Sequence, residues 1–168
     1  KMVAPNLGGT GIGRPYGGGS FSVSKKGRIV YTHTTPYHPS ELALIEKGDS
    51  KERLIMSLNN DLLKYRNLGK VEEVWYKSTF DKRDIQGWVV YPPHFDAKKK
   101  YPLLVENHGG PILNYGDRFT AEIQLYAADG YVVFYPNPRG STSYGEEFGN
   151  LLYNNYTGED YQDVMDGL

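Results

Sequence analysis

The chain has 168 residues, of which 39% are hydrophobic and 23% charged, and this composition excludes an intrinsically disordered protein. Its formal net charge of −1 argues against a nucleic-acid-binding surface, and no apolar run reaches the length of a membrane span. It contains no cysteine, which excludes disulfides, a thiol nucleophile and cysteine-ligated zinc. We therefore expect a globular protein without nucleic-acid or membrane partners.

Glycine dominates residues 1–20, which is the composition of a loop or linker. The run Gly9–Arg14 (GTGIGR) is similar to a phosphate-binding loop. It lacks the Gly-Lys-Ser/Thr ending, and no strand precedes it, so the sequence does not predict a nucleotide site here.

The next stretch predicts four short antiparallel strands separated by tight turns, at residues 21–23, 28–34, 41–46 and 53–57. Four such strands are typical of one blade of a β-propeller. A single blade cannot bury both of its faces alone, so further blades are expected outside this chain. His33 and His38 have no partner at a zinc-site spacing, so we interpret them as ordinary surface or hairpin histidines.

After a polar connector at residues 59–70, the composition changes. Residues 71–78 alternate as a strand, and residues 85–91 form a second strand that ends at Pro92-Pro93. A charged loop then leads to Tyr101, where a new apolar run begins. This order predicts a hairpin followed by a separate strand.

The segment Tyr101–Pro111 (YPLLVENHGGP) is the candidate for a catalytic role, as a loop that donates backbone hydrogen bonds in acyl transfer. It reads as a buried strand, Leu103–Val105, that runs directly into His108-Gly109-Gly110-Pro111. Acyl transfer builds negative charge on a carbonyl oxygen, and backbone N–H groups must already point at that oxygen. Glycines let the backbone approach a substrate closely. The alternative is that Gly-Gly-Pro only makes a tight turn.

A βαβ unit follows. Apolar residues recur at helical spacing from Phe119 to Ala128, and Gly130 is placed to end that helix. Tyr131–Tyr135 is a continuous apolar run, typical of a strand covered on both faces in a parallel sheet. The connection between the two strands should be right-handed.

Residues 136–145 form a second glycine-bearing loop at the carboxyl end of a strand, where open α/β sheets bind ligands. Arg139 in this loop would either neutralise a carboxylate near the site or form a structural ion pair, and we favour the ion pair. Residues 158–168 predict a terminal helix. Its aspartates Asp160, Asp163 and Asp166 recur every third residue, and we interpret them as a solvated face rather than a metal site.

In order and spacing, these segments resemble the prolyl oligopeptidase family of serine peptidases, and within it the branch of acylaminoacyl peptidases and dipeptidyl-peptidase-5-like enzymes. The likeness is dense from about residue 72 to 168 and weaker over residues 20–60. The matching segments are Ile85–Trp88 with Tyr91-Pro92, Tyr101–Leu104 with His108–Pro111, Gln124 with Ala127-Ala128 and Gly130-Tyr131, Asn137–Ser141 with Ser143–Gly145 and Phe148, and Gly158 with Asp160 and Asp163.

The resemblance implies a Ser-Asp-His triad whose serine lies on a Gly-x-Ser-x-Gly elbow. No serine of this chain carries the flanking glycines, which is the main departure from the family. Because the nucleophile comes first in the triad order, all three members would lie beyond Leu168. The chain also opens on a lysine and stops within a predicted helix, so we expect a fragment that is inactive alone.

The resemblance also implies an oxyanion donor at the backbone N–H of Gly109 or Gly110, with Gly110 preferred. His108 occupies a position where some relatives carry a tyrosine that donates to the oxyanion, and this favours the acylaminoacyl and dipeptidyl-peptidase-5-like branch. Asn137 and Arg139 would lie on a loop at the substrate edge. No metal or organic cofactor is implied.

We therefore predict an α/β fold in which residues 1–70 are the C-terminal part of a β-propeller and residues 71–168 are the N-terminal part of an α/β-hydrolase domain. The parent protein would hydrolyse short peptides, and its partners would be the peptide, the rest of its own domains and a second copy. The sequence leaves open whether the parent protein is cytoplasmic, or periplasmic or secreted. The alternatives are another ester hydrolase on the same scaffold and a non-catalytic pseudo-peptidase or interaction protein.

Overall fold

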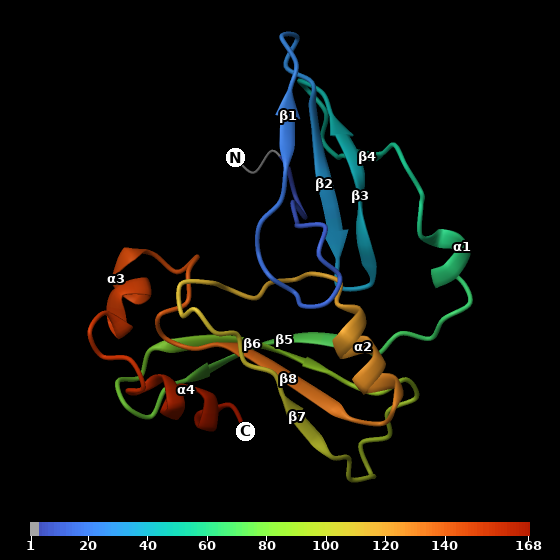
Figure 1. Cartoon of the computed structure of the whole chain (residues 1–168). Coiled ribbons are helices and arrows are strands. Elements are labelled where there is room, and N and C mark those ends of the chain that lie inside the picture. The colour runs from blue at the N-terminus through green and yellow to red at the C-terminus, as the bar shows by residue number, and fades with distance from the viewer. Residues whose placement is uncertain (1–3) are drawn as a thin grey trace. The chain divides into compact units, whose positions relative to one another are not determined.

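The computed structural model describes residues 4–168 and contains two four-stranded sheets (Figure 1). Its contacts divide the chain into two compact units. Of the described residues, the first unit contains 4–67 together with 116–122, and the second contains 68–115 together with 123–168. The division at Asn67 lies close to the expected domain boundary near residue 70, while the assignment of the two parts to a propeller and a hydrolase stays a prediction.

The first unit is built on an antiparallel sheet with its strands in sequence order, as the sequence predicts. The strands are β1 (Phe21–Val23), β2 (Ile29–Thr35), β3 (His38–Ile45) and β4 (Arg53–Leu54). Its small core contains Tyr31, Ala43 and Ile45, and Tyr31 lies directly opposite Ala43 across β2 and β3. The alternation of apolar residues along these two strands places them on one face.

Two elements of this unit differ from the sequence prediction. The expected strand at residues 53–57 is shorter in the structure, with Arg53 and Leu54 in register with β3 and one further bond from the Ile55 N–H to the Leu42 carbonyl. The apolar side chains of Ile55 and Met56 are exposed, so little burial favours a longer strand. The expected connector contains one helical turn, α1 (Asn60–Leu63). The Asn59 carbonyl accepts its first hydrogen bonds, from the N–H groups of Leu62 and Leu63. Such a short helix leaves too little periodicity to be recognised in a sequence.

The second unit is built on a mixed sheet in the order β5-β6-β8-β7. Its strands are β5 (Val71–Lys77), β6 (Asp84–Val90), β7 (Leu103–Val105) and β8 (Val132–Asn137). The expected hairpin is confirmed by the antiparallel pairing of β5 with β6, and the expected parallel pair by the pairing of β7 with β8. The orange strand β8 lies between β6 and β7 (Figure 1), and its residues 133–137 are buried, which agrees with the apolar run over its first four residues.

The core of this unit lies between the sheet and helix α2 (Ala121–Ala128). The rings of Trp88 on β6 and Tyr135 on β8 stack with their centroids 5.4 Å apart. Gly130 ends the helix with a φ of +94°, a left-handed conformation that favours glycine, as predicted. The buried core residues are Trp88, Val90, Tyr115, Ile123, Ala127, Val133 and Tyr135.

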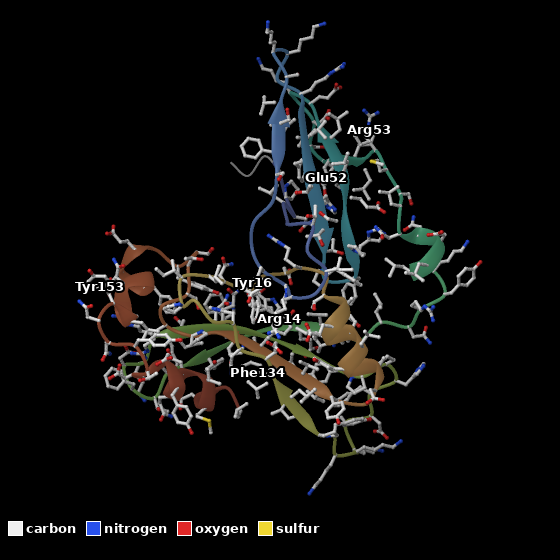
Figure 2. The ribbon with its side chains drawn as sticks, viewed as in Figure 1. Arg14, Tyr16, Glu52, Arg53, Phe134 and Tyr153 are labelled. Carbon is white, nitrogen blue, oxygen red and sulfur yellow. The ribbon has the colours of Figure 1, made fainter. Side chains whose placement is uncertain are left out.

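Phe134 of β8 occupies the opposite face of the sheet (Figure 2) and explains two glycines. A Cβ atom on Gly87 would lie 2.8 Å from the Phe134 ring, and one on Gly167 would lie 2.5 Å from it. Both positions therefore exclude a side chain while the ring stays in place. Gly167 directly follows helix α4 (Asp160–Asp166), so Phe134 fixes how closely that helix approaches the sheet.

Two short helical segments, α3 (Glu146–Gly149) and the 3-10 helix η1 (Asn150–Leu152), connect β8 to α4 and were not expected from the sequence. They contribute Phe148 and Leu152 to the buried residues. Among residues 4–168, none of the helices is both long enough and apolar enough to cross a membrane.

Candidate active site loop

The loop after β7 leaves the sheet at its carboxyl edge and contains the three residues predicted for the oxyanion hole, His108, Gly109 and Gly110. The Glu106 N–H still donates to the Phe134 carbonyl at 2.8 Å, and the chain then turns away from the sheet. Gly110 has a φ of +124°, a conformation that L-residues rarely adopt. A Cβ atom there would also lie 3.2 Å from the Ile112 nitrogen. The sequence therefore needs glycine at 110 for backbone geometry.

The backbone N–H groups of this turn are available. Within residues 4–168, neither the Gly109 nor the Gly110 N–H donates to a protein acceptor, and both residues are exposed. Backbone donors without an internal acceptor must be satisfied by solvent or by a ligand. This is the arrangement expected of N–H groups that donate hydrogen bonds to a substrate oxygen on which negative charge develops.

His108 is half-buried and bound from both sides of its ring. Its Nε2 atom lies 3.1 Å from Oδ1 of Asn137 and 3.0 Å from Oγ of Ser141. Its Nδ1 atom lies 3.2 Å from the Gly109 carbonyl oxygen. The edge of the ring also meets the ring of Tyr115, with the centroids 5.0 Å apart. These contacts hold the side chain between the loop after β7 and the loop after β8.

The surrounding hydrogen bonds favour one position for the proton of the neutral His108 ring. The Tyr115 N–H donates to Oδ1 of Asn137, and Nδ2 of Asn137 donates to the Tyr115 carbonyl, so this amide has one orientation. The Ser141 hydroxyl donates to the Pro138 carbonyl at 2.6 Å. Both partners of Nε2 are therefore acceptors toward His108, whereas Nδ1 faces one acceptor, the Gly109 carbonyl oxygen. A neutral ring carries a single proton, and the two acceptors favour placing it on Nε2.

Burial favours the neutral form of this histidine. Loss of hydration lowers the pKa of His108 below its ordinary value, and the hydrogen bonds to Gly109 and Asn137 oppose that shift only in part. At neutral pH the ring is therefore an uncharged donor at Nε2.

Asn137, expected on the substrate edge, is fully buried beneath the loop. Besides the bonds to Tyr115 and His108, its Nδ2 atom donates to the Tyr144 hydroxyl at 2.7 Å. That hydroxyl in turn donates to Gln86 of β6, and burial raises the pKa of Tyr144 to about 12. Asn137 is thus a bracing residue that joins β8, β6 and the loop after β7 through neutral hydrogen bonds.

Arg139 makes the contacts of the structural ion pair. Its guanidinium is buried and binds the carboxylate of Asp163 through two bonds of 2.8 Å. The expectation for Asp163 is wrong: this side chain is fully buried and does not belong to a solvated face. Spacing along the helix could not reveal this, because the partner lies on a distant loop.

The structure thus brings His108 and Asn137 into contact, leaves Gly109 and Gly110 beside them, and directs the Arg139 side chain toward α4. Sequence reasoning did not assign site roles to Ser141 and Tyr115. Ser141 belongs to a motif that the sequence carries, whereas nothing in the sequence near Tyr115 indicates its contacts with Asn137 and His108.

A cavity of about 780 Å³ opens beside this loop within the second unit. Its lining comes from the end of β7 with the loop after it, and from α4 with the segment before that helix. We call this cavity the α4 groove; it is lined by Val105, Asn107, His108, Pro138, Tyr156, Thr157, Gly158, Asp160, Tyr161, Val164, Met165 and Leu168.

The known proteins that are similar to this chain are peptidases of one family. Residues 117–168 match the model of the prolyl oligopeptidase family. The chain is 37% identical over 150 residues to the uncharacterized peptidase YuxL of Bacillus subtilis, covering 89% of this chain and 22% of that protein. It is 38% identical over 124 residues to dipeptidyl-peptidase 5 of Aspergillus fumigatus, covering 71% of this chain and 17% of that protein.

Among solved structures, the acylaminoacyl peptidase of Pyrococcus horikoshii is similar with a TM-score of 0.78 and 33% identity, over 88% of this chain and 23% of that one. The chain spans about a fifth of the length of the curated relatives that it matches. Family model, relatives and structural similarity all point the same way: the chain belongs to the prolyl oligopeptidase family.

Proposed function

We propose that this chain is part of a serine peptidase that hydrolyses short peptides, and that it supplies the oxyanion-binding loop without the catalytic triad. The observation that carries the proposal is the pair of free backbone N–H groups at Gly109 and Gly110, held at the carboxyl edge of β7. The similarity to dipeptidyl-peptidase 5 and to an acylaminoacyl peptidase supports peptides as the substrate class.

In this proposal, residues 1–70 are the last part of a β-propeller and residues 71–168 the first part of an α/β-hydrolase domain. The antiparallel order of the first sheet and the parallel β7–β8 pair of the second support this partition. A propeller beside the site would admit short peptides and exclude folded proteins. No resident metal or organic cofactor is required for acyl transfer to serine.

The rest of the hydrolase domain is proposed to cover the outer edge of β7 and the α4 groove. β7 lies at the edge of its sheet, so its outer backbone groups can pair with a further strand. The α4 groove beside it exposes Tyr161, Met165 and Leu168, and buried apolar surface is the main driving force for such an association.

The oxyanion role of Gly110 is tested by Gly110→Ala in the full-length protein, assayed on short peptide substrates. The added methyl group meets Ile112 and strains the left-handed backbone, so the N–H leaves its position. Loss of one oxyanion donor predicts a fall in kcat of roughly 100- to 1000-fold with a small change in KM.

Gly130→Ala is the matched control, because Gly130 also has a positive φ but has open space around its Cβ position and lies at the end of α2. It should reduce stability by about 1 kcal/mol and leave kcat within about twofold. Equal losses of kcat in both variants would contradict an oxyanion role for Gly110.

The absence of a triad from this chain is tested with a fluorophosphonate probe, which labels activated serines, and intact-mass detection. We expect the 168-residue chain to stay unlabelled, since none of its serines lies on a nucleophile elbow. Labelling of this chain would overturn that part of the proposal. A full-length protein that neither reacts with the probe nor cleaves peptides would favour the pseudo-peptidase.

A further inference from the structure

Arg139 lies at the centre of a buried network that is larger than the expected ion pair. Besides its two bonds to Asp163, its Nη2 atom donates to Oγ of Ser78 at 3.0 Å. Two longer bonds of 3.3 Å reach the carboxylate of Asp81, and the guanidinium lies 4.9 Å from the centre of the Phe80 ring. The β5–β6 turn, the loop after β8 and helix α4 therefore meet at one side chain.

The network also holds the main chain of the loop. The backbone N–H of Arg139 donates to Oδ2 of Asp163 at 2.9 Å, the same oxygen that accepts from its Nε atom. The carboxylate of α4 thus binds both the side chain and the backbone of one residue. This arrangement fixes the position of the loop itself, whereas an ordinary surface ion pair fixes only side chains.

Arg139 stands between the two residues that accept from His108. Asn137 precedes it by two positions and Ser141 follows by two, and both lie about 3 Å from Nε2 of His108. The turn between them is closed by a bond from the Ser141 N–H to the Pro138 carbonyl at 3.1 Å, with Gly140 at a φ of +89°. A displacement of Arg139 would therefore move both acceptors of the histidine.

The chain of contacts ends at the proposed oxyanion donor. Nδ1 of His108 lies 3.2 Å from the Gly109 carbonyl oxygen, so the place of the ring limits where that oxygen can lie, and the carbonyl belongs to the same peptide group as the Gly110 N–H. Because a peptide group is planar, the direction of the carbonyl sets the direction of the N–H.

We propose that Arg139 is a positioning residue for the oxyanion loop: its ion pair with Asp163 sets the places of Asn137 and Ser141, and through them the orientation of His108. The catalytic consequence rests on the proposed peptidase function, whereas the effect on His108 does not.

The substitution that tests this is Arg139→Lys, which keeps the charge. Lysine carries a single ammonium on a flexible stem and cannot bind Asp163 with two parallel bonds while also reaching Ser78. The matched control is Arg83→Lys. Arg83 belongs to the outer part of the same network, where it binds Asp81 and Glu147, each at 2.9 Å. Within residues 4–168 its side chain forms no hydrogen bond or ion pair with the loop after β8 or with His108.

The first measurement is the NMR spectrum of the His108 imidazole nitrogens in the 168-residue chain, which needs no activity. In the unaltered chain and in Arg83→Lys we expect one form, protonated at Nε2. In Arg139→Lys we expect a second, slowly exchanging form or an increased share of the Nδ1-protonated ring. A folded Arg139→Lys chain with an unchanged His108 spectrum would overturn the proposal.

If Arg139→Lys does not fold, Ser78→Ala provides the milder variant, since it removes one acceptor of Arg139 and leaves the Asp163 pair. It should shift the His108 nitrogen signals in the same direction by a smaller amount, and unchanged signals would count against the proposal.

The second measurement is peptide hydrolysis by the full-length protein. Misplacement of a catalytic group by about 1 Å costs roughly 100-fold, so Arg139→Lys should lower kcat by roughly 10- to 100-fold while KM changes less than about twofold. Arg83→Lys should leave both constants within about twofold. A full-length wild-type protein without hydrolytic activity would refute the proposed function, and the NMR result would still decide the role of Arg139.

Discussion

At the scale of single residues, His108 shows how partners fix the chemistry of a side chain. A histidine before two glycines has no defined tautomer in the sequence. Here the backbone of Tyr115 orients the Asn137 amide, and the Pro138 carbonyl takes the Ser141 proton, so that His108 faces two acceptors at Nε2. The sequence singles out this turn, but the two acceptors at Nε2 come from residues 29 and 33 positions away in the chain.

The lowered pKa of His108 predicts how stability depends on pH. The native pKa lies below the ordinary value of 6.5 because burial disfavours the charged ring. Above pH 6.5 both states are neutral and this residue contributes no pH dependence. As pH falls through the window between 6.5 and the lower native pKa, the unfolded chain binds the proton first, so the free energy of unfolding decreases.

This is checked by an NMR titration of His108 in the folded chain and by urea unfolding at pH 7.5 and pH 5. In His108→Asn the part of the pH dependence that arises in this window should disappear. A native pKa of His108 equal to 6.5 would give no slope and one above 6.5 the opposite slope, and either result would contradict the prediction.

At the scale of elements, the second sheet follows from simple patterns. The alternation in residues 71–91 and the apolar runs at 103–105 and 131–135 predicted its strands, and the structure has them within one or two residues. Hydrophobic periodicity is a local property, so it is readable in one sequence. The short segments β4, α1 and α3 carry too few residues to show a period, and their bounds depend on tertiary contacts.

Gln124 illustrates an element contact that no periodicity indicates. Its buried side chain accepts from the Gly69 N–H at 2.7 Å and donates to the Gly69 carbonyl at 3.2 Å, which ties α2 to the start of β5. Gly69 itself has no room for a side chain, since a Cβ atom would lie 2.4 Å from the Tyr91 carbonyl oxygen. These two hydrogen bonds therefore join the helix to the sheet of the second unit.

We therefore expect Gln124→Leu to lower the free energy of unfolding by about 1–3 kcal/mol, because it leaves both buried groups of Gly69 without partners. The measurement is urea unfolding followed by tryptophan fluorescence, which reports on Trp75 and Trp88. Leu125→Ala on the exposed side of the same helix serves as control and should cost less than about 0.5 kcal/mol. Similar losses for both variants would show that the Gln124 bonds contribute little.

At the scale of the whole molecule, low net charge and exposed apolar surface act together. A net charge of −1 gives little electrostatic repulsion between copies. The α4 groove exposes large apolar side chains, including Tyr161 at 68% and Leu168 at 57%. A contiguous apolar surface of this kind marks an interaction site or an aggregation liability.

The isolated chain should therefore bind the apolar dye ANS while it is folded. Met165→Lys places a charge inside the α4 groove and should reduce the dye signal severalfold. Leu125→Lys makes the same kind of change at an exposed helix position outside the groove and should leave the signal nearly unchanged. If the two variants bind the dye equally, the groove is not the apolar surface that ANS detects.

The sequence by itself determined the strands and the long helix, the β-hairpin and the parallel strand pair, the glycine turn after β7, and the resemblance to the prolyl oligopeptidase family. All of these depend on local patterns or on motifs in linear order. Only the tertiary structure decided that Asp163 is buried, that Arg139 turns toward it, and that Asn137 and Ser141 bind His108. These facts depend on contacts between segments far apart in the chain, and a burial energy is set by the partner that a residue meets in space.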